Sequence, residues 1–168
     1  VGAARAGKLE AAAQNVDVLE KLADALRDKN DAYWEGQVRI QAKAATAWIA
    51  LGQGRREDAL KLLGEAAAME DLTEKSPLSP GPLKPAREAL GDMLLELQRP
   101  AEALTEFEAT IAKEPNRFRG LYGAAVAARQ SGDTGKAGAY YARLVVMCTS
   151  GDAPGRPELQ AARDFANK

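Results

Sequence analysis

Histidine is absent from this chain, and cysteine occurs once, as Cys148. A single cysteine cannot form an internal disulfide, and without histidine the usual zinc sites cannot be built. General acid or base catalysis would depend on carboxylates, lysine, tyrosine or this cysteine. Cys148 is expected near a helix C-terminus, where the helix dipole disfavours a thiolate, so we predict a small buried apolar residue. The sequence therefore predicts a protein that is not an enzyme.

An excess of charge is also lacking, because Lys and Arg total 23 and Asp and Glu total 24, for a net charge of -1. The signs are interspersed, which leaves no basic surface for nucleic acid or an anionic membrane. The longest nearly apolar run, Ala44–Gly52, is far too short to span a bilayer. We expect a soluble protein. No leader opens the chain at Val1, but a parent chain could carry one, so cytoplasmic and exported locations both remain open.

Signatures of bound cofactors are missing as well. The stretch GQGRR at Gly52–Arg56 lacks the spacing of a phosphate-binding loop and lies between two expected helices. Glu88, Asp92 and Glu96 project from one helical face at steps of four. Such a stripe is either a solvated face, the commoner case, or a divalent cation site. We predict no cofactor, no metal and no catalytic residue.

Apolar residues recur at steps of three and four almost throughout, which predicts amphipathic helices and no strand. Short separators such as Arg99–Pro100 and Ser131–Asp133 favour antiparallel helical hairpins. Asp31 is a plausible N-cap of one long helix. The expected helices are Gly7–Asp28, Asp31–Leu51, Arg55–Glu70, Leu83–Leu97, Ala101–Lys113, Asn116–Gln130, Thr134–Val146 and Pro157–Ala166.

An internal repeat is the strongest pattern in the sequence. A shift of 34 residues aligns the segment that begins at Ala89 with the segment that begins at Gly123. The matched pairs put small residues where two helices of a hairpin would touch and an aromatic one turn later; they are Leu90 with Ala124, Gly91 with Ala125, Ala103 with Ala137, and Phe107 with Tyr141.

These residues, with Pro115 ending the unit, resemble the tetratricopeptide repeat, and in particular uncharacterised bacterial proteins of that family. The resemblance implies an all-α fold, a right-handed α-α superhelix of helical hairpins with a C-terminal capping helix. It implies one solenoid domain over residues 1–168, and we expect this domain to be part of a longer chain. Its predicted parts are a half repeat (7–28), a looser repeat (31–70), a proline-rich insertion (71–83), two well-matched repeats (84–117 and 118–149) and the cap (156–167).

The stretch Glu74–Pro85, which overlaps this insertion, holds four of the eight prolines within nine residues, Pro77 to Pro85. Proline lacks an amide proton and favours extended backbone before it, so this segment interrupts the helices. Ala59 and Ala103 lie 44 residues apart instead of 34, which predicts about ten inserted residues between two repeats. The insertion is either a rigid spacer or a lip over the ligand groove.

Tetratricopeptide arrays bind partners on the concave face formed by the first helix of each hairpin. Carried over residue by residue, the resemblance places ten residues on this groove: Trp34, Gln37, Gln41, Trp48, Glu88, Asp92, Arg119, Tyr122, Val126 and Arg129. The family's clamp for C-terminal carboxylates uses Lys and Asn at positions held here by Glu88, Asp92, Tyr122 and Val126. The sequence therefore lacks that clamp.

Aromatic residues beside opposite charges suit an extended peptide or a helix of mixed charge. Trp34 and Trp48 are either groove residues or ordinary core between hairpins. We expect a protein-interaction scaffold that binds a protein or peptide partner. Two alternatives remain open: a homodimer through the N-terminal half repeat, where Leu9, Val16 and Leu19 lack a hairpin partner, and a ligand-sensing regulatory segment of a larger protein.

Overall fold

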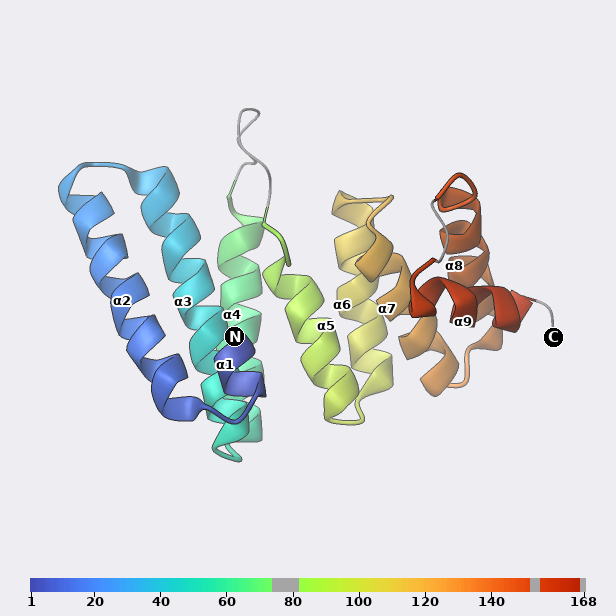
Figure 1. Cartoon of the computed structure of the whole chain (residues 1–168), viewed down its shortest axis with the longest axis horizontal. Coiled ribbons are helices and arrows are strands. Elements are labelled where there is room, and N and C mark those ends of the chain that lie inside the picture. Colours follow the sequence, from blue (N-terminus) through green and yellow to red (C-terminus); the bar gives the residue numbers. More distant parts are fainter. Residues whose placement is uncertain (74–81, 152–154, 167–168) are drawn as a thin grey trace. The chain divides into compact units, whose positions relative to one another are not determined.

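Figure 1 shows the computed structural model, which describes residues 1–73, 82–151 and 155–166. Every regular element in these ranges is an α-helix, so the predicted all-α class is confirmed. The eight expected helices are present with ends shifted by at most three residues, and a short helix precedes them. The helices are α1 (Gly2–Arg5), α2 (Leu9–Asp28), α3 (Ala32–Gly52), α4 (Arg56–Asp71), α5 (Ala86–Glu96), α6 (Pro100–Lys113), α7 (Phe118–Gln130), α8 (Thr134–Met147) and α9 (Pro157–Ala166).

The chain forms two compact units, Val1–Leu90 and Gly91–Lys168, whose boundary lies inside α5. In unit 1, α2 packs against α3 and α3 against α4, while α1 contacts both α2 and α3. In unit 2, α6 packs against α7, α7 against α8, and α8 against α9. Most of the predicted insertion, residues 74–81, lies outside the described residues, and so does the choice between spacer and groove lip.

The same turn joins the first helix of each hairpin to the second. Gly7, Gly54, Gln98 and Gly132 all have positive φ, between 59 and 90°, in the left-handed region. Each amide donates to the carbonyl three residues earlier, and the next amide donates to the carbonyl five residues before it, for example Asp133 N to Ala128 O at 2.9 Å. This is the Schellman motif, which satisfies the last carbonyls of a helix and reverses the chain. The same turn also joins α2 to α3 at Asn30, so the repeat pattern, and not the turn alone, makes α1, α3, α5 and α7 first helices and α2, α4, α6 and α8 second helices.

A buried alanine follows each turn from a first to a second helix at a constant distance. Ala12, Ala59, Ala103 and Ala137 each lie five residues after the positive-φ residue, and all are at most 3% exposed. A side chain of one carbon lets the two helix axes of a hairpin approach closely. Hence the small residues that the repeat pattern singled out occupy the interior of the hairpins.

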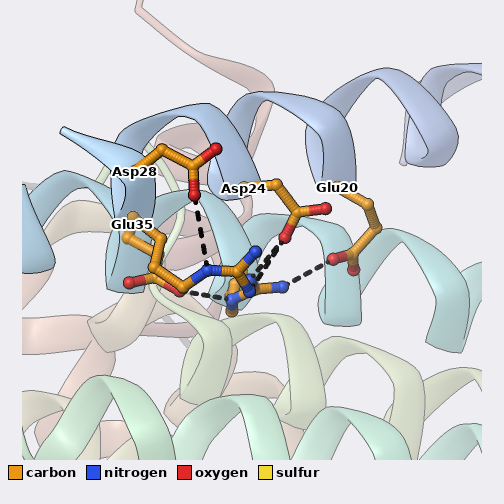
Figure 2. A network of polar contacts seen from close by, with 6 residues as sticks. Glu20, Asp24, Asp28 and Glu35 are labelled. Atoms are coloured by element: carbon orange, nitrogen blue, oxygen red, sulfur yellow. Dashed lines mark hydrogen bonds and ion pairs between the residues drawn. The ribbon is translucent and has the colours of Figure 1, made fainter. Parts of the chain in front are cut away.

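The helices α2 and α3 are also joined by ion pairs on one side. Arg39 donates to Glu20 at 2.9 Å and to Asp24 at 3.0 Å on α2, and to Glu35 at 2.9 Å on its own helix (Figure 2). The hydrogen bonds to Glu35 and Asp24 raise the pKa of Arg39. Because all three carboxylates converge on one guanidinium, this side of the α2–α3 pair is closed by polar contacts.

Three polar residues of α3 and α5 have polar partners. Lys43 donates to Glu65 on α4 at 2.7 Å, and the Thr46 hydroxyl donates to the carbonyl of Ala42 at 3.0 Å. Arg87 pairs with Asp71. The predicted N-cap is confirmed, since the Asp31 carboxylate accepts a hydrogen bond from the amide of Trp34 at 3.2 Å.

Candidate partner-binding surface

On α3, the four predicted groove residues Trp34, Gln37, Gln41 and Trp48 are spaced by three, four and seven residues, so they share one face of the helix. Trp34 is 45% exposed, Gln41 is exposed and Gln37 is half-buried. These three side chains reach solvent along the first half of α3.

Trp48 does not reach solvent, because it is only 2% exposed. The guanidinium carbon of Arg5, in α1, lies 4.6 Å from the centroid of the Trp48 ring. This stacking and the contacts of α1 with α3 cover the end of α3 that bears Trp48. The interpretation of Trp48 as an accessible anchor is therefore corrected: Trp48 belongs to the core of unit 1.

On α7, the predicted residues Arg119, Tyr122, Val126 and Arg129 follow one another at steps of three and four, and we call this face the α7 surface. Arg119 and Arg129 are exposed, and Tyr122 and Val126 are half-buried between them. The other faces of α7 are buried and consist almost wholly of small residues: Gly120, Leu121, Gly123, Ala124, Ala125, Ala127 and Ala128.

Close packing against α6 and α8 fixes the α7 surface in place. A Cβ atom added at Gly123 would lie 2.3 Å from the Phe107 ring, and one at Gly91 would lie 2.8 Å from it. Tyr122 lies beside Tyr141 of α8, with ring centroids 6.2 Å apart. Because α7 has almost no bulk on its inner faces, it sits deep against Phe107 and presents its one bulky, charged face outward.

Helix α9 borders the α7 surface at its Arg119 end. Arg119 lies 3.7 Å from Glu158, and Arg156 stacks over Phe118 at 5.0 Å from the ring centroid. At the other end, burial raises the pKa of Tyr141, while the positive charge of Arg129 acts in the opposite direction. The α7 surface thus has Arg119 beside the Glu158 carboxylate at one end and Arg129, ten residues further along the helix, at the other end.

The two predicted groove residues of α5, Glu88 and Asp92, differ in their exposure to solvent. Glu88 is only 1% exposed, so it does not line an open groove, and this corrects its predicted position. Asp92 is half-buried. Glu88 lies in unit 1 and Asp92 in unit 2. Cys148, expected to be buried, is half-buried at the C-cap of α8.

Several exposed apolar side chains were missed by the sequence analysis. Val18 and Leu22 on α2 and Tyr33 at the start of α3 are all more than one-third exposed, and the Tyr33 ring lies edge-on to Trp34 with centroids 5.1 Å apart. Val18 and Leu22 are four residues apart and lie off the main apolar stripe of α2. That second, shorter stripe was the signal that could have revealed them.

No group of three or more His, Cys, Asp or Glu side chains able to hold a metal ion occurs in the described ranges. Within the same residues, no helix is both long enough and apolar enough to cross a membrane.

Comparison with known proteins supports the resemblance to tetratricopeptide proteins. Residues 88–157 match the family model described as "Tetratricopeptide repeat". No curated protein sequence matches the chain significantly.

Solved structures share the fold at low sequence identity. A putative kinesin light chain of Podospora anserina with nearly identical TPR-like repeats matches with a TM-score of 0.63 and 17% identity, over 98% of this chain and 78% of that one. MamA matches with a TM-score of 0.56 and 20% identity, over 93% and 88%. PcrH from Pseudomonas aeruginosa matches with a TM-score of 0.56 and 16% identity, over 77% and 89%. The fold is therefore that of tetratricopeptide-like helical hairpins.

Proposed function

We propose that this chain is a non-enzymatic protein-interaction module that binds a protein or peptide segment on the α7 surface. One observation carries the proposal: Tyr122 and Val126 remain half-buried between two exposed arginines, on a helix whose other faces are packed. Aromatic residues and arginine are enriched among residues that dominate binding energy. The match to the tetratricopeptide repeat covers α7 and both of its neighbours.

The charges on the α7 surface favour a partner segment that carries an acidic residue. Arg129 is exposed, and Arg119 shares its charge with Glu158 at 3.7 Å, which is a weak, solvated pair. A segment that places an apolar side chain against Tyr122 and an acidic residue near Arg129 would be complementary. Such a partner should bind more weakly as salt is added, because exposed charges are screened.

Site-specific photocrosslinking tests this proposal. A photoreactive amino acid at Val126 should capture a defined protein from a lysate of the source organism. The same group at Ala142, an exposed residue of α8, is the matched control. Tyr122→Ala and Arg129→Glu should each reduce capture from Val126 at least tenfold, because they remove the aromatic contact and reverse the orienting charge.

Thermal unfolding distinguishes loss of binding from loss of fold. Arg129→Glu should melt within a few degrees of the parent, since exposed single charges contribute little to folding. Tyr122→Ala also removes the contact with Tyr141, so it should melt at a lower temperature but stay folded at the temperature of the capture experiment. Capture that is equal from Val126 and Ala142, or that survives both substitutions, would contradict binding on the α7 surface.

A further inference from the structure

The exposed side chains of α7 form a narrow stripe. At about 3.6 residues per turn, Arg119, Tyr122, Val126 and Arg129 lie within about 80° of one another round the helix axis. On a helix about 10 Å across, this arc is about 7 Å wide. Helix α7 is held between α6 and α8, and α9 borders it, so the exposure of the stripe does not result from where the sequence begins or ends.

The width of the stripe fits an extended segment better than a helix. A helix with its side chains is roughly 10–12 Å across, whereas neighbouring extended chains lie about 4.8 Å apart. Helix α9 also closes the stripe at one end, where Glu158 lies beside Arg119 and Arg156 stacks over Phe118. One extended chain can therefore lie along the α7 surface, whereas a partner helix would extend beyond it on both sides.

The two arginines define a spacing along this stripe. They are ten residues apart, which is about 15 Å along the axis, with Tyr122 and Val126 at about 4.5 and 10.5 Å. An extended chain advances about 3.3 Å per residue and directs every second side chain to the same face. Two carboxylates four residues apart are thus separated by about 13 Å, a distance that two flexible arginine side chains can match. The residue midway between them would lie over Tyr122 and Val126.

The charges of the stripe select carboxylates. Helix α7 contains no aspartate or glutamate, so both of its charged side chains on this face are positive. Glu158 of α9 lies 3.7 Å from Arg119, whose side chain is 56% exposed. A pair this long and this exposed contributes little to stability, so a carboxylate of a partner can replace Glu158 at low cost. Glu158 thus acts as a competitor at this end of the stripe.

We infer that the α7 surface binds an extended segment of a partner protein with the pattern acidic–x–apolar–x–acidic. The inference rests on the proposed function, since it specifies the partner of the same surface. The apolar residue covers Tyr122 and Val126, and the two carboxylates pair with Arg119 and Arg129. Binding displaces Glu158 from Arg119.

Three capped peptides of identical composition test the spacing. The peptide GSETITESG has its glutamates four residues apart with isoleucine midway, and its threonines and isoleucine favour extended backbone. In GSTEIETSG the glutamates are two residues apart, and in GESTITSEG they are six apart. Each peptide is titrated into the full chain, and NMR follows the amides of α7 and the methyl groups of Val126.

We expect saturable shifts along the α7 surface with GSETITESG. The other two peptides should bind at least threefold more weakly, because neither can pair with both arginines while its isoleucine covers Tyr122. Glu158→Gln should tighten binding of GSETITESG about two- to fivefold, since Arg119 loses its competing carboxylate. The matched control is Asp164→Asn, which removes the same charge from an exposed position of α9 and should leave the affinity unchanged.

Combined changes in protein and peptide identify which charges pair. Arg119→Gln and Arg129→Gln each remove one arginine, and the peptides GSQTITESG and GSETITQSG each lack one glutamate. Each peptide change should weaken binding to the parent at least threefold. In each arginine variant one of the two peptide changes should lose its effect, and it should be a different one in each variant. Circular dichroism should show both variants folded, because exposed charges contribute little to folding.

Equal affinities for the three isomeric peptides would overturn the inference, as would the absence of shifts on α7 at about 5 mM GSETITESG. An affinity that Glu158→Gln leaves unchanged would contradict the competition at Arg119. Photocrosslinking separates these failures from failure of the proposed function. Specific capture from Val126 without discrimination among the peptides would retain the α7 surface as a binding site and reject the spacing, whereas equal capture from Val126 and Ala142 together with absent shifts would reject both.

Discussion

Gly123 and Gly64 both lie within helices, but a Cβ atom added at Gly123 would meet another side chain, whereas one added at Gly64 would not. At Gly123 it would lie 2.3 Å from the Phe107 ring, whereas at Gly64 nothing lies within 4 Å. Gly123→Ala should therefore lower the free energy of unfolding by about 1–3 kcal/mol through overpacking. Gly64→Ala should raise it by about 0.5–1 kcal/mol, because alanine favours the helix more than glycine does.

Urea unfolding of both variants measures these changes. Phe107→Leu in the Gly123→Ala background should recover part of the loss, since the smaller side chain vacates the space that the new methyl group needs. A Gly123→Ala variant as stable as the parent would mean that α7 does not lie against Phe107.

The two tryptophans differ in exposure, and quenching can separate them. In Trp48→Phe the fluorescence comes from Trp34, which is 45% exposed, so acrylamide should quench it strongly. In Trp34→Phe it comes from Trp48, which is 2% exposed beneath Arg5, so quenching should be several-fold weaker. Arg5→Ala in this second background should increase quenching. Equal quenching of both single-tryptophan proteins would contradict the burial of Trp48.

Tyr140 gives the chain a defined response to alkaline pH. Burial and the hydrogen bond that its hydroxyl donates to Glu108, at 2.8 Å, raise the pKa of Tyr140 to about 12. Burial opposes ionisation of Glu108, but hydrogen bonds from Lys136 and Tyr140 outweigh it and lower the Glu108 pKa. The folded Tyr140 pKa exceeds the unfolded value of about 10, so its stabilising contribution is complete below about pH 10 and is lost as pH rises toward 12.

The melting temperature of the parent should therefore fall more steeply between about pH 10 and 12 than that of Tyr140→Phe, which has no proton to lose at this position. Circular dichroism melts at several pH values measure the difference. Parallel curves for the two proteins would contradict the raised pKa.

At the scale of elements, the residues with positive φ can be exchanged between two equivalent hairpin turns to test their equivalence. Gln98 and Gly132 occupy equivalent turns with φ of 59° and 90°, a region that glycine adopts without a steric penalty. Gln98→Gly should stabilise the protein by up to about 1 kcal/mol, and Gly132→Gln should destabilise it by a similar amount. Denaturant midpoints test both, and changes of the same sign would show that the two turns are not equivalent.

The sequence predicted elements well where a periodic stripe spans several turns, as in α2 to α9. It missed α1, because four residues before Gly7 are too few to display a period. That omission left Trp48 open between groove residue and core, because the residue that stacks on it, Arg5, lies 43 positions earlier. Glu88 was misplaced for a related reason: periodicity assigns a helical face, but burial of that face depends on which other elements cover it.

At the scale of the whole molecule, the two compact units predict that a destabilising substitution in one unit leaves the stability of the other unchanged. In arrays of hairpins each repeat contacts only its neighbours, so stability is transmitted between adjacent elements. Gly123→Ala should accelerate amide hydrogen exchange in α6, α7 and α8 while the amides of α2, α3 and α4 keep their protection. Uniform loss of protection along the chain would show instead that both units open together.

The constant turn within each hairpin also determines where new sequence can be added. Three residues always separate the end of a first helix from the start of a second: 6–8, 53–55, 97–99 and 131–133. The links from a second helix to the next first helix vary in length, and residues 114–117 between α6 and α7 do not form this turn. A fluorescent protein or an epitope tag grafted into the second kind of link should leave every hairpin intact, whereas the same graft at Gly54 or Gly132 should abolish the hairpin it divides.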